Sequence, residues 1–154
     1  MNEGAVQGLY LAQIGDYQYE FVASTDIQAE TMVAFVPDTL LMTTQGALEH
    51  SPTCKVIQEK GLLDQLRSRV VAPLAVYFME QRTDPQSHWA SYFAAMNPDL
   101  SNHLIFWTEE ELEWLKGSEI IGYNNQLKRK INGDYQLLSE NIPGFAEQFS
   151  ERDF

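Results

Sequence analysis

The sequence predicts an α+β fold in which short N-terminal β-strands are followed by a mainly helical region. Apolar and polar residues alternate with a period of two only in the first part of the chain. Farther along, apolar residues recur every three or four positions. No repeat, low-complexity tract or linker interrupts the 154 residues. Residues 1–154 are therefore expected to form a single domain, with strands within 8–43 and helices within 56–140.

A β-hairpin is expected first. Residues 8–14 form a short apolar run, and aromatic residues alternate with polar ones across 17–23. Gly15 and Asp16 between these runs are typical of a tight turn with positive φ at the glycine. Residues 31–36 are rich in β-branched and aromatic side chains, which predicts a third strand, and 40–43 could add a very short fourth.

Helices are expected after the strands. An apolar stripe with a spacing of four predicts a helical face, formed by Leu62, Leu66, Val70, Leu74 and Phe78. Pro73 should start a new helix within this stretch or kink the existing one. A second helix is expected over 86–96. Thr108 and Glu111 have the spacing of a capping box at the start of a third helix, which Gly117 should end. A longer helix should then run from about Ser118 to Leu138.

The charge of the chain excludes some classes of partner. Ten Lys and Arg residues stand against 22 Asp and Glu residues, which gives a net charge of -12. Binding to nucleic acid or to an anionic membrane depends on basic side chains, so neither partner is expected. A neutral or basic protein is a better match to this negative charge than either of those partners. Residues 1–13 do not resemble a signal peptide, and no apolar run is long enough to span a bilayer, so the protein is expected to be soluble and intracellular.

The residues alone indicate no catalytic site and no metal site. Cys54 is the only cysteine, which excludes an intrachain disulfide and argues against both a zinc site and a cysteine nucleophile. The histidines lack metal-ligand spacing and are expected to lie at the surface or in hydrogen bonds; they are His50, His88 and His103. A cluster of four glutamates is expected to form the solvated start of a helix rather than a metal site; they are Glu109, Glu110, Glu111 and Glu113. The three tryptophans are expected to pack in the core rather than to line a peptide groove; they are Trp89, Trp107 and Trp114.

Three segments, in this order and at these separations, resemble one protein family. The first contains Ala-Ser-Thr-Asp-Ile at 23–27, Val-Pro at 36–37 and Leu-Leu-Met-Thr at 40–43. The second is Ser-His-Trp-x-x-Tyr at 87–92, and the third is Phe-Trp-Thr-Glu-Glu-Glu-Leu at 106–112. Together they are similar to SET-domain protein methyltransferases, in the subgroup of the Rubisco large-subunit lysine and actin-histidine methyltransferases. The similarity covers roughly residues 17–138.

The resemblance implies a SET fold whose first strands form one edge of a methyl-donor site and whose helices form the insert that follows. Members transfer a methyl group from S-adenosylmethionine to a lysine or histidine nitrogen of a protein. The family's cofactor turn, of the type Glu-Gly-x-Gly-Leu, would fall on Tyr17, Gln18, Tyr19, Glu20 and Phe21. Gln18 and Glu20 replace the two glycines, so these residues are not expected to bind the cofactor.

The family's Asn-His cofactor motif and its channel tyrosine have no counterpart in this sequence, so no catalytic residue is assigned. Two interpretations follow from the resemblance, and a third, an unrelated small α+β binding domain with chance similarity, also stays open. The chain could be the N-terminal portion of a larger SET-domain methyltransferase, inactive alone and completed by the rest of that domain. Alternatively, it could be a degenerate SET-derived structural or interaction subunit of a larger assembly. The sequence does not distinguish lysine from histidine as the acceptor.

Overall fold

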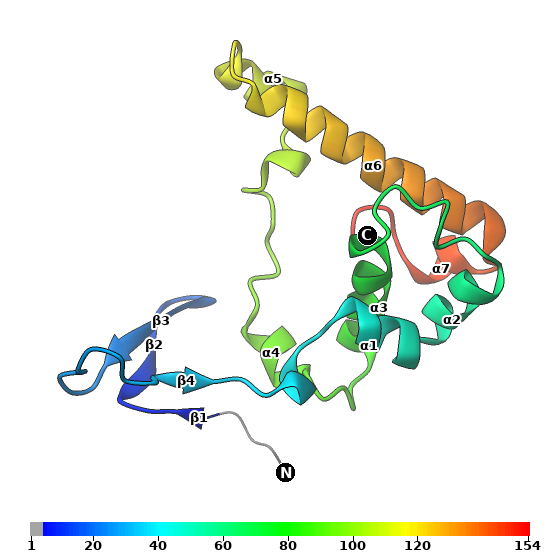
Figure 1. Cartoon of the computed structure of the whole chain (residues 1–154). Helices are drawn as coiled ribbons and strands as arrows, with labels where there is room; N and C mark the ends of the chain where they lie inside the picture. The colour runs from blue at the N-terminus through cyan, green and yellow to red at the C-terminus, as the bar shows by residue number, and fades with distance from the viewer. Residues whose placement is uncertain (1–4) are drawn as a thin grey trace.

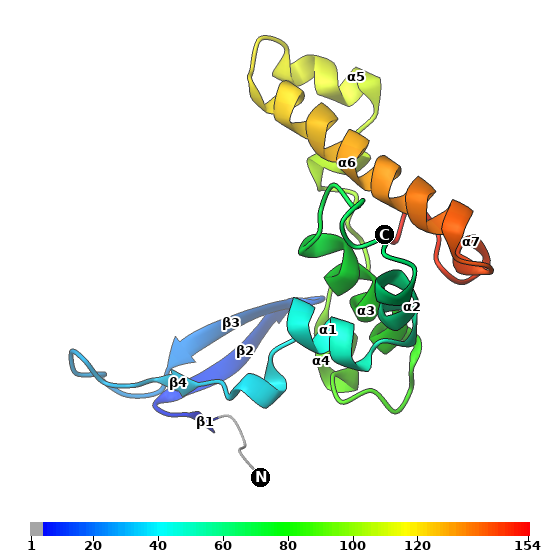
Figure 2. The same cartoon turned by 45° about the vertical axis from the view of Figure 1, so that its right-hand side comes forward.

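The computed structural model describes residues 5–154 and confirms the α+β fold class. Four strands come first: β1 (Ala5–Val6), β2 (Leu9–Gly15), β3 (Gln18–Ala23) and β4 (Ala34–Phe35). Helices make up the rest: α1 (Thr44–His50), α2 (Pro52–Glu59), α3 (Val71–Thr83), α4 (Ala90–Ala95), α5 (Glu109–Leu112), α6 (Ile120–Asn141) and α7 (Phe145–Gln148). Three short 3-10 helices lie between them: η1 (Asp38–Leu40), η2 (Leu104–Phe106) and η3 (Glu113–Leu115). Figure 1 shows the strands projecting from one end of the helical part, and Figure 2 shows the same separation after rotation.

The expected hairpin is present. Strands β2 and β3 pair antiparallel, with Leu11 opposite Phe21 and an irregularity between Gln13 and Gly15. The positive φ of the turn is not at the glycine, as the sequence predicted, but at Tyr17, whose φ is 55°. The left-handed region is uncommon for a residue other than glycine, so the turn places its strain on an aromatic residue.

The two later strands differ from the prediction. The third is reduced to Ala34–Phe35, which pairs antiparallel with β1 rather than with the hairpin. The predicted fourth strand at 40–43 is absent, because Asp38–Leu40 forms a 3-10 helix and an extended segment leads from it to Thr43. A β-branched run therefore did not suffice to extend the sheet where no neighbouring strand was available.

Helices α1 and α2 were not predicted as separate elements, although both carry N-terminal caps. The Thr43 hydroxyl accepts a hydrogen bond from the amide of Gly46 at 3.0 Å. The Ser51 hydroxyl accepts one from the amide of Cys54 at 2.9 Å, and Pro52 fills the first helical position. This Ser-Pro pair is the sequence signal that ends α1 and begins α2.

Pro73 lies in the first turn of α3, as expected, but the predicted helical stripe before it is wrong. Residues 60–70 form turns, although Leu62 and Leu66 are both buried. The backbone amides of Arg67 and Ser68 instead donate to the two carboxylate oxygens of Asp134, at 2.6 and 2.9 Å. A helix through these residues would have used those amides internally.

The later helices follow the prediction more closely. The capping box at Thr108 and Glu111 is confirmed, with both reciprocal hydrogen bonds present. Hydrogen bonds from Thr108 lower the pKa of Glu111, because they favour its charged form. Gly117 has a φ of 88° and ends the short α5–η3 segment. The long helix expected after it is α6, and within residues 5–154 no helix is both long and apolar enough to cross a membrane.

The hydrophobic core belongs entirely to the helical part. Thirteen buried residues form one cluster, and the first of them in the sequence is Ala47. Its members come from α1, α2, the 60–70 turns, α3, the end of α6 and α7. The strands contribute none of them, so the helical part carries the packing that stabilises the chain. The cluster comprises Ala47, Cys54, Ile57, Leu62, Leu66, Ala72, Val76, Tyr77, Met79, Leu138, Ile142, Phe145 and Phe149.

Replacing Asp134 should strongly destabilise the helical part. Asp134 is 1% exposed, and its removal would leave two backbone amides without acceptors. Asp134→Ala should lower the free energy of unfolding by about 2–4 kcal/mol, measured by urea denaturation. Asp64→Ala is the matched control, because that exposed carboxylate only pairs with Arg69, and it should change the value by less than about 0.5 kcal/mol. Equal effects of the two substitutions would contradict the role given to Asp134.

Candidate functional site

The residues that align with the family's cofactor turn lie at the tip of the hairpin and along β3. Successive side chains of a strand point to opposite faces, so Gln18 and Glu20 share one face while Tyr19 and Phe21 share the other. Gln18 lies close to the turn: a Cβ built on Gly15 would be 2.9 Å from its Oε1. A ligand that approached the backbone of β3 from this face would meet two long polar side chains. This strand therefore does not fit the close backbone contact that glycines would permit.

The opposite face of the hairpin is mainly apolar and uncovered, with Gln13 as its polar residue opposite Tyr19. Leu11 and Phe21 are directly paired across the strands and are 54% and 66% exposed, and Tyr19 is 40% exposed. A two-stranded ribbon has little stability of its own unless another layer packs against it. An exposed apolar face of this kind is typical of a surface that packs against more polypeptide.

A small apolar cavity of about 350 Å³ lies where the strand region joins the helices. Trp89 anchors it: its indole nitrogen donates to the carbonyl oxygen of Leu40 at 3.1 Å, and its ring packs edge-on against Tyr77. Two motifs that are far apart in the sequence, Leu-Leu-Met and Ser-His-Trp, therefore meet here. The cavity is lined by Leu40, Leu41, Met42, Leu74, Phe78, Trp89 and Tyr92.

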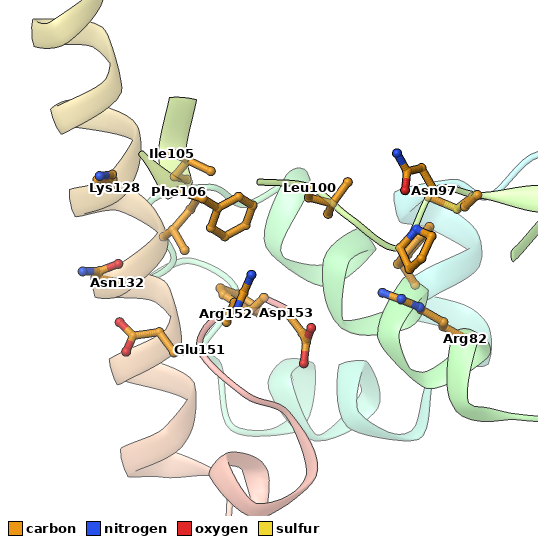
Figure 3. Close-up of a pocket in the computed structure, with 15 residues that line it drawn as sticks. Arg82, Asn97, Leu100, Ile105, Phe106, Lys128, Asn132, Glu151, Arg152 and Asp153 are labelled. Atoms are coloured by element: carbon orange, nitrogen blue, oxygen red, sulfur yellow. The ribbon is translucent and has the colours of Figure 1, made fainter. Parts of the chain in front are cut away.

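A larger cavity of about 620 Å³ opens between α3, α6, the segment 96–106 and residues 151–154 (Figure 3). Its walls combine aromatic and aliphatic side chains with charged groups. The guanidinium of Arg152 lies 5.6 Å from the ring centroid of Phe106, within cation–π distance. Lys128 and Asn132 line the cavity from α6, and Arg82 lines it from α3.

The larger cavity has both apolar and charged walls, but it lacks a recognisable set of catalytic groups. Its described lining includes no histidine, cysteine, serine, threonine or tyrosine. The charged residues that line it are Arg82, Lys128, Glu151, Arg152 and Asp153. This cavity could not be predicted from the sequence, because its walls come from four separate segments and no motif links them.

The other candidate residues lie apart from both cavities. All three histidines are exposed, and no group of three or more His, Cys, Asp or Glu side chains among residues 5–154 could hold a metal ion. The exposed glutamates of α5 match the solvated helix start that was expected. The prediction that the tryptophans are core residues is wrong for Trp114, which is 89% exposed, whereas Trp89 packs against the core.

Cys54 is a structural residue in this fold. It is fully buried, and its thiol donates to the carbonyl oxygen of Pro73 at 3.3 Å. Burial raises the pKa of the Cys54 thiol to about 11, a hydrogen bond with Ser51 acts in the opposite direction, and the negative charge of Glu80 adds to the increase. A thiol that is buried and protonated at neutral pH is a poor nucleophile.

The arrangement of strands and helices matches a known fold. The chain superimposes on a crystal structure of the SET domain of LSMT bound to MeLysine and AdoHcy, with a TM-score of 0.75 and 18% sequence identity. The match covers 95% of this chain and 33% of that chain, so the fold is that of part of a SET domain.

Sequence comparison leads to the same class. The actin-histidine N-methyltransferases of Rhinolophus ferrumequinum and Homo sapiens are 26% and 25% identical to this chain over 120 residues. Those residues are 78% of this chain, and they span about a fifth (19%) of the curated relatives' own length. No protein-family model matches the chain. Sequence and fold comparisons thus agree that this chain is similar to part of SET-domain methyltransferases, which confirms the resemblance seen in the sequence.

The Cys54 thiol should be inert in the folded protein. At pH 8 a pKa of about 11 leaves about 0.1% of the thiol as thiolate, against roughly a quarter for an unfolded cysteine. Reaction with a disulfide reagent should therefore be at least about 100-fold slower than in urea. Because the pKa is raised on folding, stability should be complete below the unfolded pKa and should decrease as the pH rises from about 8.5 towards 11. Cys54→Ala should remove that decrease, and rapid labelling of the native protein would contradict the assignment.

Proposed function

We propose that this chain is the N-terminal portion of a SET-domain, S-adenosylmethionine-dependent protein N-methyltransferase whose acceptor is a lysine or a histidine. The observation that carries the proposal is the fold match, which uses nearly all of this chain but only a third of the SET structure. Within this proposal, residues 8–43 provide the strand edge of the SET domain, and residues 56–140 provide its helical segment and insert. The 154 residues alone do not catalyse methyl transfer.

The uncovered hairpin supports an incomplete catalytic domain. The apolar side chains of Leu11, Tyr19 and Phe21 project from a ribbon that no other part of residues 5–154 covers. The rest of a SET domain is the partner that would bury this face and complete the methyl-donor site. The chain's net charge of -12 favours a neutral or basic surface on that complementary part.

A second candidate is a degenerate SET-derived structural or interaction subunit. It is favoured by Gln18 and Glu20, because their side chains occupy the face of β3 from which a cofactor would approach. In this alternative the same apolar hairpin face binds another protein of an assembly, and no cofactor is bound. The two candidates differ in whether the native protein transfers a methyl group.

The isolated chain should not bind the methyl donor. Calorimetric titration of the 154 residues with S-adenosylmethionine or S-adenosylhomocysteine should give no binding heat, because only one side of the donor site is present. Gln18→Gly/Glu20→Gly should not bind the methyl donor either. Removing two side chains from β3 does not supply the residues that would form the rest of the donor site. Micromolar binding by the unsubstituted chain would overturn the proposal that it is incomplete.

Two measurements on the native protein separate the candidates. If its mass exceeds that of the 154 residues and it transfers labelled methyl groups from S-adenosylmethionine to a protein, the enzyme proposal holds. If its mass equals that of the 154 residues, and it enters an assembly without transferring methyl groups, the result supports the second candidate, a structural or interaction subunit. A longer native protein without methyl transfer would contradict the enzyme proposal.

The apolar hairpin face should make the isolated chain self-associate. Leu11→Ser/Phe21→Ser should reduce the fluorescence of a bound hydrophobic dye and lower the sedimentation coefficient of any oligomers, because it removes exposed apolar surface. The thermal midpoint should hardly change, since neither side chain belongs to the core. Val71→Ser, at a 63% exposed position on α3, is the control and should leave dye binding unchanged. An unchanged dye signal in the double variant would show that this face is not the exposed apolar surface of the chain.

A further inference from the structure

A second apolar surface lies at the other end of the molecule, away from the hairpin. Figures 1 and 2 show α5 beside the first turns of α6, at the end of α6 opposite to α7. Three large side chains on α6 are exposed there: Ile120 (46%), Tyr123 (67%) and Leu127 (37%). Their spacing of three and four residues places them on one helical face. Trp114 of η3, just before the turn into α6, is 89% exposed, and we call these four residues the helical tip.

The fold itself gives no reason for this exposure. None of the four residues belongs to the core cluster or packs against it. An exposed tryptophan is unusual at a free surface, whereas tryptophan and tyrosine are enriched in the centres of protein interfaces. The four side chains are therefore available to a partner without unfolding any described element.

The charges around the helical tip identify the chemistry of that partner. Between residues 109 and 127 the chain has five exposed glutamates and a single basic residue, Lys116, and the exposed Arg129 and Lys130 follow on α6. Glu111 takes part in the capping box, and Glu113 pairs with Lys116 at 3.2 Å. Three glutamates form no ion pair with any described residue, namely Glu109, Glu110 and Glu119. An apolar centre beside unpaired carboxylates complements a partner with apolar anchors and flanking lysine or arginine.

We propose that the helical tip is a docking surface for a basic amphipathic segment of a partner protein. The aliphatic and aromatic anchors of that segment pack on Trp114, Tyr123 and their neighbours. Its lysine or arginine side chains pair with Glu109, Glu110 and Glu119. This surface is separate from the hairpin and from both cavities, so it does not depend on whether the chain belongs to an enzyme.

Synthetic peptides test the proposal directly. The probe is a labelled 14-residue helical peptide with leucines spaced three and four residues apart and lysines elsewhere. The matched control peptide carries glutamates in place of the lysines. Fluorescence anisotropy should show binding of the basic peptide only. Its affinity should fall as salt is raised, because the glutamates of the tip are exposed.

Substitutions in the chain locate the binding site. Trp114→Ala/Tyr123→Ala should weaken binding of the basic peptide at least tenfold. Glu109→Gln/Glu110→Gln/Glu119→Gln should weaken it about fivefold and reduce its salt dependence. Tyr92→Ala is the control, because Tyr92 is an equally accessible aromatic residue (59% exposed) on α4, and it should leave the affinity unchanged. All these positions are exposed, so the variants should keep the thermal midpoint of the parent chain.

Several results would overturn the proposal. No binding of the basic peptide at 1 mM, equal binding of the acidic peptide, or equal losses in the Trp114 and Tyr92 variants would each do so. A dimer that Trp114→Ala dissociates would assign the tip to a second copy of the chain. In the native protein without added partner, Trp114 should be oxidised readily by N-bromosuccinimide. Protection there would assign the tip to the rest of its own assembly and would equally overturn the proposal.

Discussion

The helical part depends on the carboxylate of Asp134, which α6 presents to the turns between α2 and α3. It accepts the backbone amides of Arg67 and Ser68, so it fixes where the irregular segment ends and α3 can begin. Gly133 allows the close approach: a Cβ there would be 2.7 Å from the guanidinium carbon of Arg67. The Arg67 guanidinium in turn donates to the carbonyl oxygen of Arg129. The buried Asp134 side chain thus links α6 to the turns that precede α3, and both helices line the larger cavity.

The buried core and the exposed apolar strands lie in different parts of the chain. Buried side chains are concentrated in the helices after residue 46, whereas the strands before it expose their apolar residues. This division agrees with the structural comparison, in which nearly all of this chain matches one third of a SET-domain structure. The helical part has its own core, and the ribbon gains an apolar neighbour only when further polypeptide packs on it.

The sequence predicted the elements whose signals are local. The hairpin, the capping box at Thr108 and the long α6 follow from alternation, cap chemistry and helical periodicity. The prediction was wrong where a distant contact determined the local structure. The stripe through Leu62 and Leu66 is buried but not helical, because the amides that follow it donate hydrogen bonds to Asp134 instead. The cavities could not be predicted, since their walls are assembled from distant segments. The motifs found by resemblance were more informative, because Leu40 and Trp89 are joined by a hydrogen bond.

The length of α6 has a mechanical consequence. Its 22 residues make a rod of about 33 Å, and the fourteen steps from Asp134 back to Ile120 span about 21 Å. A tilt of about 5° at the Asp134 end would displace the far end by roughly 2 Å, the size of a typical helix shift in a conformational switch. Such a tilt would strain the two hydrogen bonds that join Asp134 to the amides of Arg67 and Ser68. These hydrogen bonds, together with the packing of Leu138 in the core, limit how far the exposed start of α6 can move.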